Sequence, residues 1–270
     1  MSWKMQVSRA AAVLVLFVVA SWLPARAAHG TDAASGPNVD LSRPALPAPR
    51  VSPAVPPNGL AATRDYLFAL AEAVVSQVPS SSSKSSSASE AQDAVLSGLA
   101  GAAFVRAYGY LDQAWRSRVP FSMFTGQWSG VRRMDVLAVL PAGSPSGART
   151  AQRAFAEVRL FADTPRPVIV LAYGTFLAAP ERGGYFLTSG SLHDEPHLPS
   201  GTNPPSPSAV AQAVVAAANP GTEPTAGLAR SGAQPHTVTV TVSIGPTTAP
   251  TIVQLYQLVN GQWVVIQTQR

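Results

Sequence analysis

Apolar residues in the first foldable part of the chain recur at the spacing of a helix. Leu67, Leu70 and Val74 fall on one face, and Asn58 stands where its side chain could cap the first turn. This spacing predicts a helix from about Leu60 to Val78. Beyond it, a run of serines predicts a flexible link, because such a run cannot form a packed core.

A second helix is expected after Ser89, because Ser89 and Gln92 have the three-residue spacing of a capping box. Its apolar stripe consists of large side chains: Phe104, Tyr108, Leu111 and Trp115. A stripe of this kind is typical of a helix that packs on a sheet. A short helical turn is expected around Pro120 to Trp128.

The period of the pattern then changes to two. Four alternating runs, bounded by Gly or Pro, extend over 134–140, 155–161, 168–177 and 185–192. They predict a meander of antiparallel strands with the long helix lying across it. The expected fold class is therefore α+β, with a helix packed on a curved antiparallel sheet.

The C-terminal part predicts a second, smaller or truncated copy of this arrangement. A helical pattern extends from Ala209 to Ala218, and alternating runs follow at His236 to Ile244, Ile252 to Val259 and Gln262 to Gln269. The last two runs are joined by Asn260-Gly261, a strong hairpin signal. The chain is expected to end in a three-stranded antiparallel meander.

A short internal repeat supports the idea of two copies. Pro167 to Tyr173 and Pro250 to Tyr256 share a Pro, a central Ile-Val pair and a Tyr at the same spacing. If the two segments are equivalent, each is a strand of a different sheet and pairs with the strand that follows it. Each Tyr should also share a face with the Ile four residues earlier.

The N-terminus predicts export. A short basic start precedes an apolar run from Ala10 to Leu23, and Ala25-Arg26-Ala27 is a typical cleavage signature. The run is shorter than the roughly 20 apolar residues that a membrane-spanning helix needs. A cleaved signal peptide is the first interpretation, and an uncleaved membrane anchor is the alternative. The expected location is extracellular or at the cell surface.

Composition changes along the chain predict its domain organisation. The expected parts are a signal peptide or anchor (1–27), a Pro-rich disordered spacer (28–58), a helix with a Ser-rich linker (59–88), a first cone-like domain (89–197), a linker (198–208), and a smaller helix with a three-stranded meander (209–270).

Charge argues against a nucleic-acid protein. The net charge is +5, but Lys4, Arg9 and Arg26 lie in the leader, so the remainder carries +5 − 3 = +2. A phosphate-binding surface needs clustered basic residues, and no such cluster follows the leader. Direct binding of nucleic acid is not expected.

The order of these elements resembles a known fold. Phe104-Val-Arg-Ala-Tyr108, then Trp128, then Tyr173-Gly-Thr-Phe176 before Gly184-Tyr185 are similar to the nuclear transport factor 2-like, or cystatin-like, cone. The resemblance covers Ser89 to about Leu192. Two such modules behind a basic start, an apolar segment and a Pro-rich spacer are similar to the conjugative-transposon transfer proteins of the TcpC-like type. The resemblance implies a scaffold outside the membrane that joins other transfer subunits.

Catalytic motifs are missing from the sequence. The string most like a hydrolase elbow has Pro145 at the nucleophile position, and no Gly-rich phosphate loop is present. Without Cys, thiolate chemistry and thiolate metal sites are excluded. His193 and His197 flank two acids, but Pro196 prevents the helix on which the two imidazoles could converge. No metal and no cofactor is expected.

Acid–base catalysis in the cone would need a buried acid or His. The span from Ser89 to Leu192 contains no His. Its acids in predicted helices and strands are Glu90, Asp93, Asp112, Asp135 and Glu157. Asp112 is expected in solvent at the edge of the apolar stripe, and nothing in the sequence marks Glu157 as buried. The sequence therefore predicts a protein that is not an enzyme.

Two classes of function remain open at this point. In the first, aromatic residues at the cone mouth bind other extracytoplasmic proteins or a second copy of the chain; in the second, the same residues line a pocket for a small ligand. The residues concerned are Tyr108, Trp115, Phe121, Phe124 and Trp128. All five could instead be ordinary core residues. Contact with a membrane is expected only through the N-terminal segment, if that is uncleaved.

Overall fold

The computed structural model describes residues 40–49, 55–76, 98, 100–143, 150–163, 167–196, 203–246 and 248–269. The predicted signal segment, the capping box at Ser89 and the serine run lie outside the described residues. No helix in the described part of the chain combines the length and the apolar character needed to cross a membrane.

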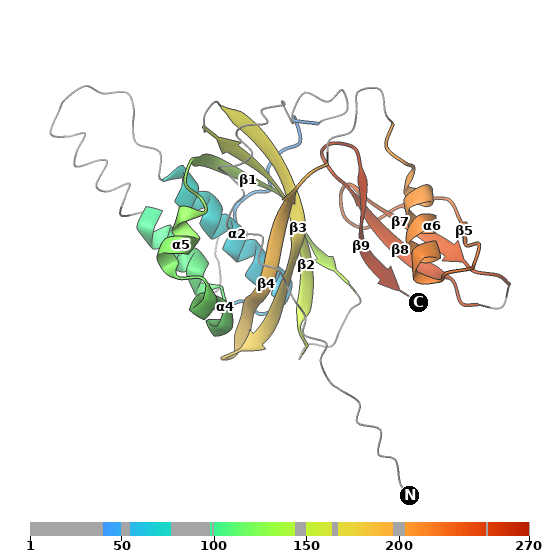
Figure 1. The fold of residues 1–270 in the computed structure, drawn as a ribbon, viewed down its shortest axis with the longest axis horizontal. Coiled ribbons are helices and arrows are strands. Elements are labelled where there is room, and N and C mark those ends of the chain that lie inside the picture. The colour runs from blue at the N-terminus through green and yellow to red at the C-terminus, as the bar shows by residue number, and fades with distance from the viewer. Residues whose placement is uncertain are drawn as a thin grey trace, which may run out of the picture.

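The first unit, residues 55–196, is built on a four-stranded antiparallel sheet. Its strands are β1 (Val131–Ala142), β2 (Gln152–Ala162), β3 (Val168–Glu181) and β4 (Gly184–Asp194), paired in the order β1-β2-β3-β4 (Figure 1). Helix α2 (Gly59–Val75) lies across one face of this sheet. The predicted α+β class, a helix on an antiparallel sheet, is confirmed.

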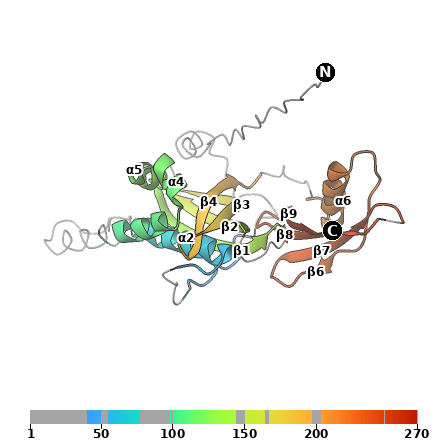
Figure 2. The ribbon, with the colours of Figure 1, turned by 90° about the horizontal axis from the view of Figure 1, so that it is seen from below.

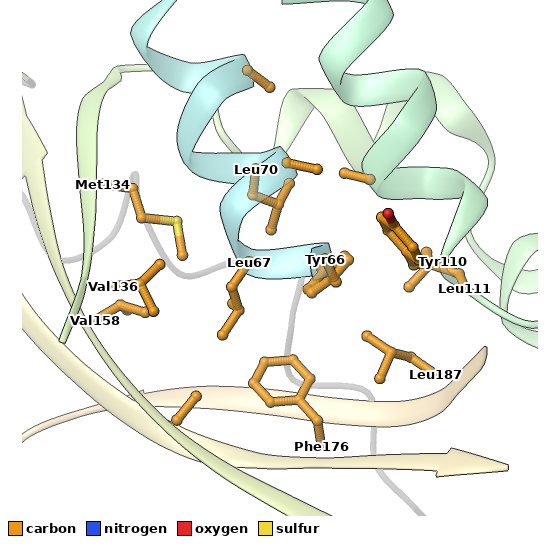
Figure 3. Packing of buried hydrophobic residues seen from close by; sticks show 14 of the residues in the cluster. Tyr66, Leu67, Leu70, Tyr110, Leu111, Met134, Val136, Val158, Phe176 and Leu187 are labelled. Atoms are coloured by element: carbon orange, nitrogen blue, oxygen red, sulfur yellow. The ribbon is translucent and has the colours of Figure 1, made fainter. Parts of the chain in front are cut away.

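Helix α2 is part of the first unit, whereas the sequence placed this segment in front of the first domain. The Asn58 side chain accepts a hydrogen bond from the Ala61 amide and caps the helix as predicted. Leu67 and Leu70 are fully buried in the same core as Val136 of β1 and Phe176 of β3 (Figure 3). The predicted start of the first domain at residue 89 is therefore too late, because the sheet buries the apolar face of α2.

The predicted long helix with the aromatic stripe is interrupted. Residues 100–109 are helical, and α4 (Gln113–Arg118) and α5 (Phe121–Gly126) follow as separate short helices. Between residue 109 and α4 the chain bonds to the edge strand β4. The Leu187 amide donates to the Tyr110 carbonyl, and the Asp112 amide donates to the Leu187 carbonyl. These bonds to β4 replace the helical ones, so the helix cannot continue.

A β-bulge in β1 sends its apolar residues to both faces of the sheet. Val136 pairs with Val158 and Ala138 pairs with Glu157, so Leu137 is an extra residue on β1. Before the bulge, Val136 faces α2. After it, Ala138 and the following alternate residues face the opposite side. The alternating apolar residues of this strand, which the sequence pattern placed on one face, therefore lie on both faces of the sheet.

The second unit, residues 203–269, places one helix on a second antiparallel sheet (Figures 1 and 2). Helix α6 (Pro207–Ala218) packs on the sheet, and the strands are β5 (Thr225–Ala226), β6 (Arg230–Ser231), β7 (Thr237–Ser243), β8 (Thr251–Gln257) and β9 (Trp263–Gln269). The order is β5-β7-β8-β9, and β6 also pairs with β7. The predicted three-stranded meander is present, and the two short strands were not expected.

The geometric conditions set by the internal repeat are met. The strands that follow Pro167 and Pro250 lie in different sheets, and β3 pairs with β4 as β8 pairs with β9. Tyr173 and Tyr256 both lie on the side of their sheet away from the helix and pack in one cluster with Phe155. The ring of Phe155 lies 6.2 Å from that of Tyr173 and 5.2 Å from that of Tyr256.

Candidate functional site

The two units contact each other through the faces of their sheets that carry no helix. Figures 1 and 2 both place the second sheet beside the first sheet, on the side opposite to α2. Leu140 and Phe155 of the first unit pack with Tyr256, Leu258 and Ile266 of the second. This contact buries apolar side chains from both units, and it also encloses charged ones.

Glu157 is the centre of a buried charged cluster at this contact. Its side chain is fully buried on β2 and faces away from α2. One carboxylate oxygen, Oε2, accepts from the Tyr256 hydroxyl at 2.6 Å and from Arg43 Nη1 at 3.2 Å. The other oxygen, Oε1, accepts from the Val259 amide at 2.7 Å. Two of the three donors come from the second unit.

Arg43 lies on a segment that the sequence assigned to a disordered spacer. Residues 40–49, here called the strap, run along the contact between the units. The Asp40 amide donates to the Val259 carbonyl at 2.9 Å, and the Leu46 amide donates to the Val136 carbonyl at 2.7 Å. Only 6% of the Arg43 side chain is exposed. The prediction of a disordered spacer is therefore wrong for the strap, because its backbone and the Arg43 side chain form hydrogen bonds with both units.

Glu195, immediately after β4, is the second buried acid of the cluster. Its Oε2 accepts from the Asn260 amide at 3.2 Å, and its backbone amide donates to the Leu171 carbonyl at 2.8 Å. Burial first, and then the neighbouring Glu157, raises the pKa of Glu195 to about 9. A side-chain hydrogen bond with Glu157 also favours the protonated form of Glu195. At neutral pH the raised pKa favours a protonated Glu195 beside the Arg43–Glu157 pair.

The fold separates the polar residues from His193 to Glu195, which were examined above as possible metal ligands. Glu195 faces the second unit, whereas the His193 ring lies 2.9 Å from the Ser191 hydroxyl in an exposed position. His197 lies outside the described residues. Within the described residues, no group of three or more His, Cys, Asp or Glu side chains is arranged to hold a metal ion.

Two other acids that were candidates for catalysis, Asp135 and Asp112, have structural partners. Asp135 is buried beside Arg159, whose Nη2 and Nε donate to its Oδ2 at 2.6 and 3.0 Å. Arg159 Nη1 also donates to the Leu41 carbonyl of the strap at 2.6 Å. Asp112 caps α4, since its side chain accepts from the Trp115 amide. Glu90 and Asp93 lie outside the described residues.

The five predicted aromatic residues lie together around α4 and α5. The Tyr108 ring is 5.3 Å from those of Phe121 and Phe124, and its hydroxyl donates to the Val119 carbonyl at 2.7 Å. Phe124 is buried, while Trp115 and Trp128 are half-buried against the core. Phe121 is 38% exposed. Four of the five therefore contribute to packing, and Phe121 also faces solvent.

A groove of about 880 Å³ lies beside α2, and it is lined by a different set of residues. Asp65 and Phe68 of α2 lie on its wall with Tyr110, and an ion pair between Arg106 and Glu72 also lines it. Burial, and then the nearby Asp65, raises the pKa of Tyr110. None of the five predicted aromatic residues lines this groove.

Comparisons with known proteins add little to these contacts. No protein-family model matches the chain, and neither does any curated protein. Among solved structures, the chain is similar to an "Ntf2 like protein involved in plasmid conjugation", with 9% sequence identity and a TM-score of 0.25, over 74% of this chain and 92% of that chain. At this identity and score, nothing about the function of that protein is carried over.

Proposed function

We propose that this chain is a non-enzymatic scaffold that acts outside the cytoplasmic membrane and binds other extracytoplasmic proteins through its first unit. The observation that carries the proposal is the exposure of two large apolar side chains on the short helix α5. Phe121 is 38% exposed and Met123 is 50% exposed, directly beside the buried Phe124. Large apolar side chains in solvent at the edge of a core are typical of a contact surface.

The use of the buried acids supports a role without catalysis. A general acid or base must reach a substrate proton from a cavity. Glu157 is instead enclosed between the units and held by Arg43, and Asp135, which lines the groove beside α2, is paired with Arg159. Their charges are balanced by fixed neighbours, as in a structural contact.

The finer part of the proposal is that the scaffold belongs to a conjugative transfer apparatus. Its support is the sequence order of a basic start, an apolar segment, a Pro-rich stretch and two helix-plus-sheet units, which resembles the TcpC-like transfer proteins. Such a resemblance in order is an argument by analogy. The transfer role therefore needs a genetic test that is separate from the test of the contact surface.

The transfer role is tested by deleting the gene in frame and measuring the frequency of conjugation. Transfer should fall and should be restored by the wild-type gene. Restoration should fail with Phe121→Ser/Met123→Ser, which removes the proposed contact surface, and should succeed with Leu228→Ser, which changes an 89% exposed side chain on the second unit. Unchanged transfer in the deletion strain would reject the transfer role.

The contact surface itself is tested by a photo-crosslinking residue at position 121 in growing cells. We expect a crosslink to a discrete exported protein, and no such product from the same residue at position 228. If neither position gives a product, or both give the same one, the proposed surface is wrong. N-terminal sequencing of membrane and medium fractions tests export, since a start near Ala28 indicates cleavage and an intact Met1 in membranes indicates an anchor.

The groove beside α2 favours a second candidate function, the binding of a small ligand. Its wall joins the apolar Phe68 to the buried carboxyl of Asp65, a pairing that suits an aromatic amine. Tryptamine is a suitable probe. It should raise the melting temperature of the wild-type protein but not that of Asp65→Asn, and equal behaviour of both proteins would reject this alternative.

A further inference from the structure

The strap is the one described segment outside the two units that bonds to both of them. On the first unit it accepts from Arg159 through the Leu41 carbonyl and donates to Val136 through the Leu46 amide. On the second unit it donates to the Val259 carbonyl through the Asp40 amide. A peptide that reaches both bodies in this way adds to the strength of their contact.

Arg43 concentrates the polar contacts of the strap in one side chain. Its Nη1 donates to Glu157 of the first unit at 3.2 Å and to the Tyr256 hydroxyl of the second at 3.0 Å. The same nitrogen reaches the Gln257 carbonyl at 2.9 Å, and Nη2 reaches the Leu258 carbonyl at 3.4 Å. The planar guanidinium is suited to several acceptors at once, which a lysine could not match.

Removal of Arg43 would leave Glu157 as a buried anion with donors only from Tyr256 and Val259, both on the second unit. A buried charge without a counter-charge is strongly unfavourable. Separation of the two units would relieve this, because Glu157 lies on the outer face of its own sheet and would then meet water. The charge balance of the contact therefore depends on the strap.

We propose that the strap is a releasable clamp. With Arg43 seated between Glu157 and Tyr256 it holds the two units as one body, and its withdrawal lets the second unit separate from the first. The strap precedes the first unit in the chain, so a pull on its N-terminal end acts first on the bonds of Asp40 and Leu41 and then on Arg43. This inference concerns the contact between the units and does not depend on the proposed function.

The contact between the units could also be released by a change in the charge of the Glu157–Glu195 carboxyl pair. Glu195 is faced by Glu157 on β2, by Arg43 on the strap and by the Asn260 amide. Glu157 is in turn close to Tyr256 on β8 and to His236 before β7. Arg43 provides the cation for this group. Loss of the Glu195 proton would leave two carboxylates against one guanidinium, so alkaline pH should weaken the same contact.

The clamp can be tested by measuring the distance between the units. The chain contains no Cys, so Ala114→Cys on α4 and Ala213→Cys on α6 provide two unique, exposed sites for spin labels. Pulsed electron resonance should give a narrow distance distribution at neutral pH. Arg43→Gln should broaden it and shift it to longer distances, whereas Arg230→Gln, at an exposed arginine of the second unit, should leave it unchanged.

A second variant separates loss of the clamp from loss of folding. Arg43→Gln/Glu157→Gln removes both charges, so no buried anion is left unpaired. It should retain the circular dichroism of the wild type, and its distance distribution should be narrower than that of Arg43→Gln, because no unpaired buried anion then favours separation. Equal broadening in the two variants would contradict this charge argument. A narrow, wild-type distribution in Arg43→Gln itself would show that apolar contacts alone hold the units and would overturn the proposal.

The proton-dependent route has its own comparison. At pH 10 the wild-type distribution should broaden, and that of Glu195→Gln should remain narrow, because the amide cannot become an anion. A wild-type distribution that stays narrow at pH 10 contradicts this route. Equal broadening in both proteins would assign the effect to other groups and would also contradict it.

Discussion

The first and second units both place a helix on an antiparallel sheet, yet they bury very different amounts of apolar material. In the first unit, α2, the helical residues 100–109 and the short α5 all contribute to one core with the four strands. In the second unit, α6 is the one helix that packs on the sheet, and the core beneath it is a small cluster around Val240 and Leu255. A small core stabilises a fold only weakly.

Because its own core is small, the second unit buries several of its large apolar side chains at the contact with the first unit. Tyr256 and Leu258 are almost completely buried, but their cover comes from the first unit rather than from α6. The first unit has the opposite arrangement, since its core lies under its own helices. The second unit therefore depends on its neighbour for much of its apolar burial.

The largest effect is expected from Arg43→Met. It leaves the buried Glu157 without its cation, and breaking a buried ion pair in this way typically costs about 3–5 kcal/mol of unfolding free energy. Chemical denaturation monitored by circular dichroism measures the loss. Arg43→Met/Glu157→Leu should recover much of it, because no charge is then buried. A loss below that of an exposed control such as Arg230→Met would contradict the role of the cluster.

Matched Leu→Ala changes compare the two cores directly. Leu67 in the first unit and Leu255 in the second are both fully buried. Such changes typically cost about 2–5 kcal/mol, and the loss is smaller where the surroundings can collapse into the cavity. We expect the greater loss of unfolding free energy from Leu67→Ala, because its core cluster is much the larger of the two and leaves less room to collapse. A greater loss from Leu255→Ala would reverse the comparison.

The pH dependence of stability tests the carboxyl pair at the contact. The pKa of Glu195 is raised in the folded protein to about 9, so the folded state holds this proton more tightly than the unfolded state does. Its contribution is full below the unfolded pKa and is lost as pH rises toward about 9, with a slope of at most roughly 1.4 kcal/mol per pH unit. Urea midpoints measured from pH 5 to 9 should show this fall, and Glu195→Gln should flatten it.

The smallest effect on stability is expected at the proposed contact surface. Phe121→Ser and Met123→Ser change exposed side chains, and surface changes usually alter unfolding free energy by about 0.5 kcal/mol or less. Phe124→Ala, at the buried neighbour, should cost about 3–5 kcal/mol. A large loss in the Phe121 variant would assign it to the core and remove the main support for a partner surface.

Local sequence was sufficient to predict most of the helices and strands. Period-two alternation identified β1 to β4 and β7 to β9, since side chains of a strand point to opposite faces whatever the sheet contains. Asn58 and Asn260-Gly261 act within a few residues of themselves, so the start of α2 and the turn before β9 were also predictable. The aromatic residues around α5 were identified as a group for the same reason.

The contact between the units could be found only in the tertiary structure. Nothing beside Glu157 in the sequence marks it as buried, because the residues that bury it, Arg43 and Tyr256, are far away along the chain. Arg43 itself lies among prolines, a composition that favours an extended spacer. An extended peptide becomes ordered where a body offers partners for its backbone and side chains. The sequence by itself determined the helices, the strands and the absence of Cys, whereas long-range packing decided which charges are buried and which segments hold the two units together.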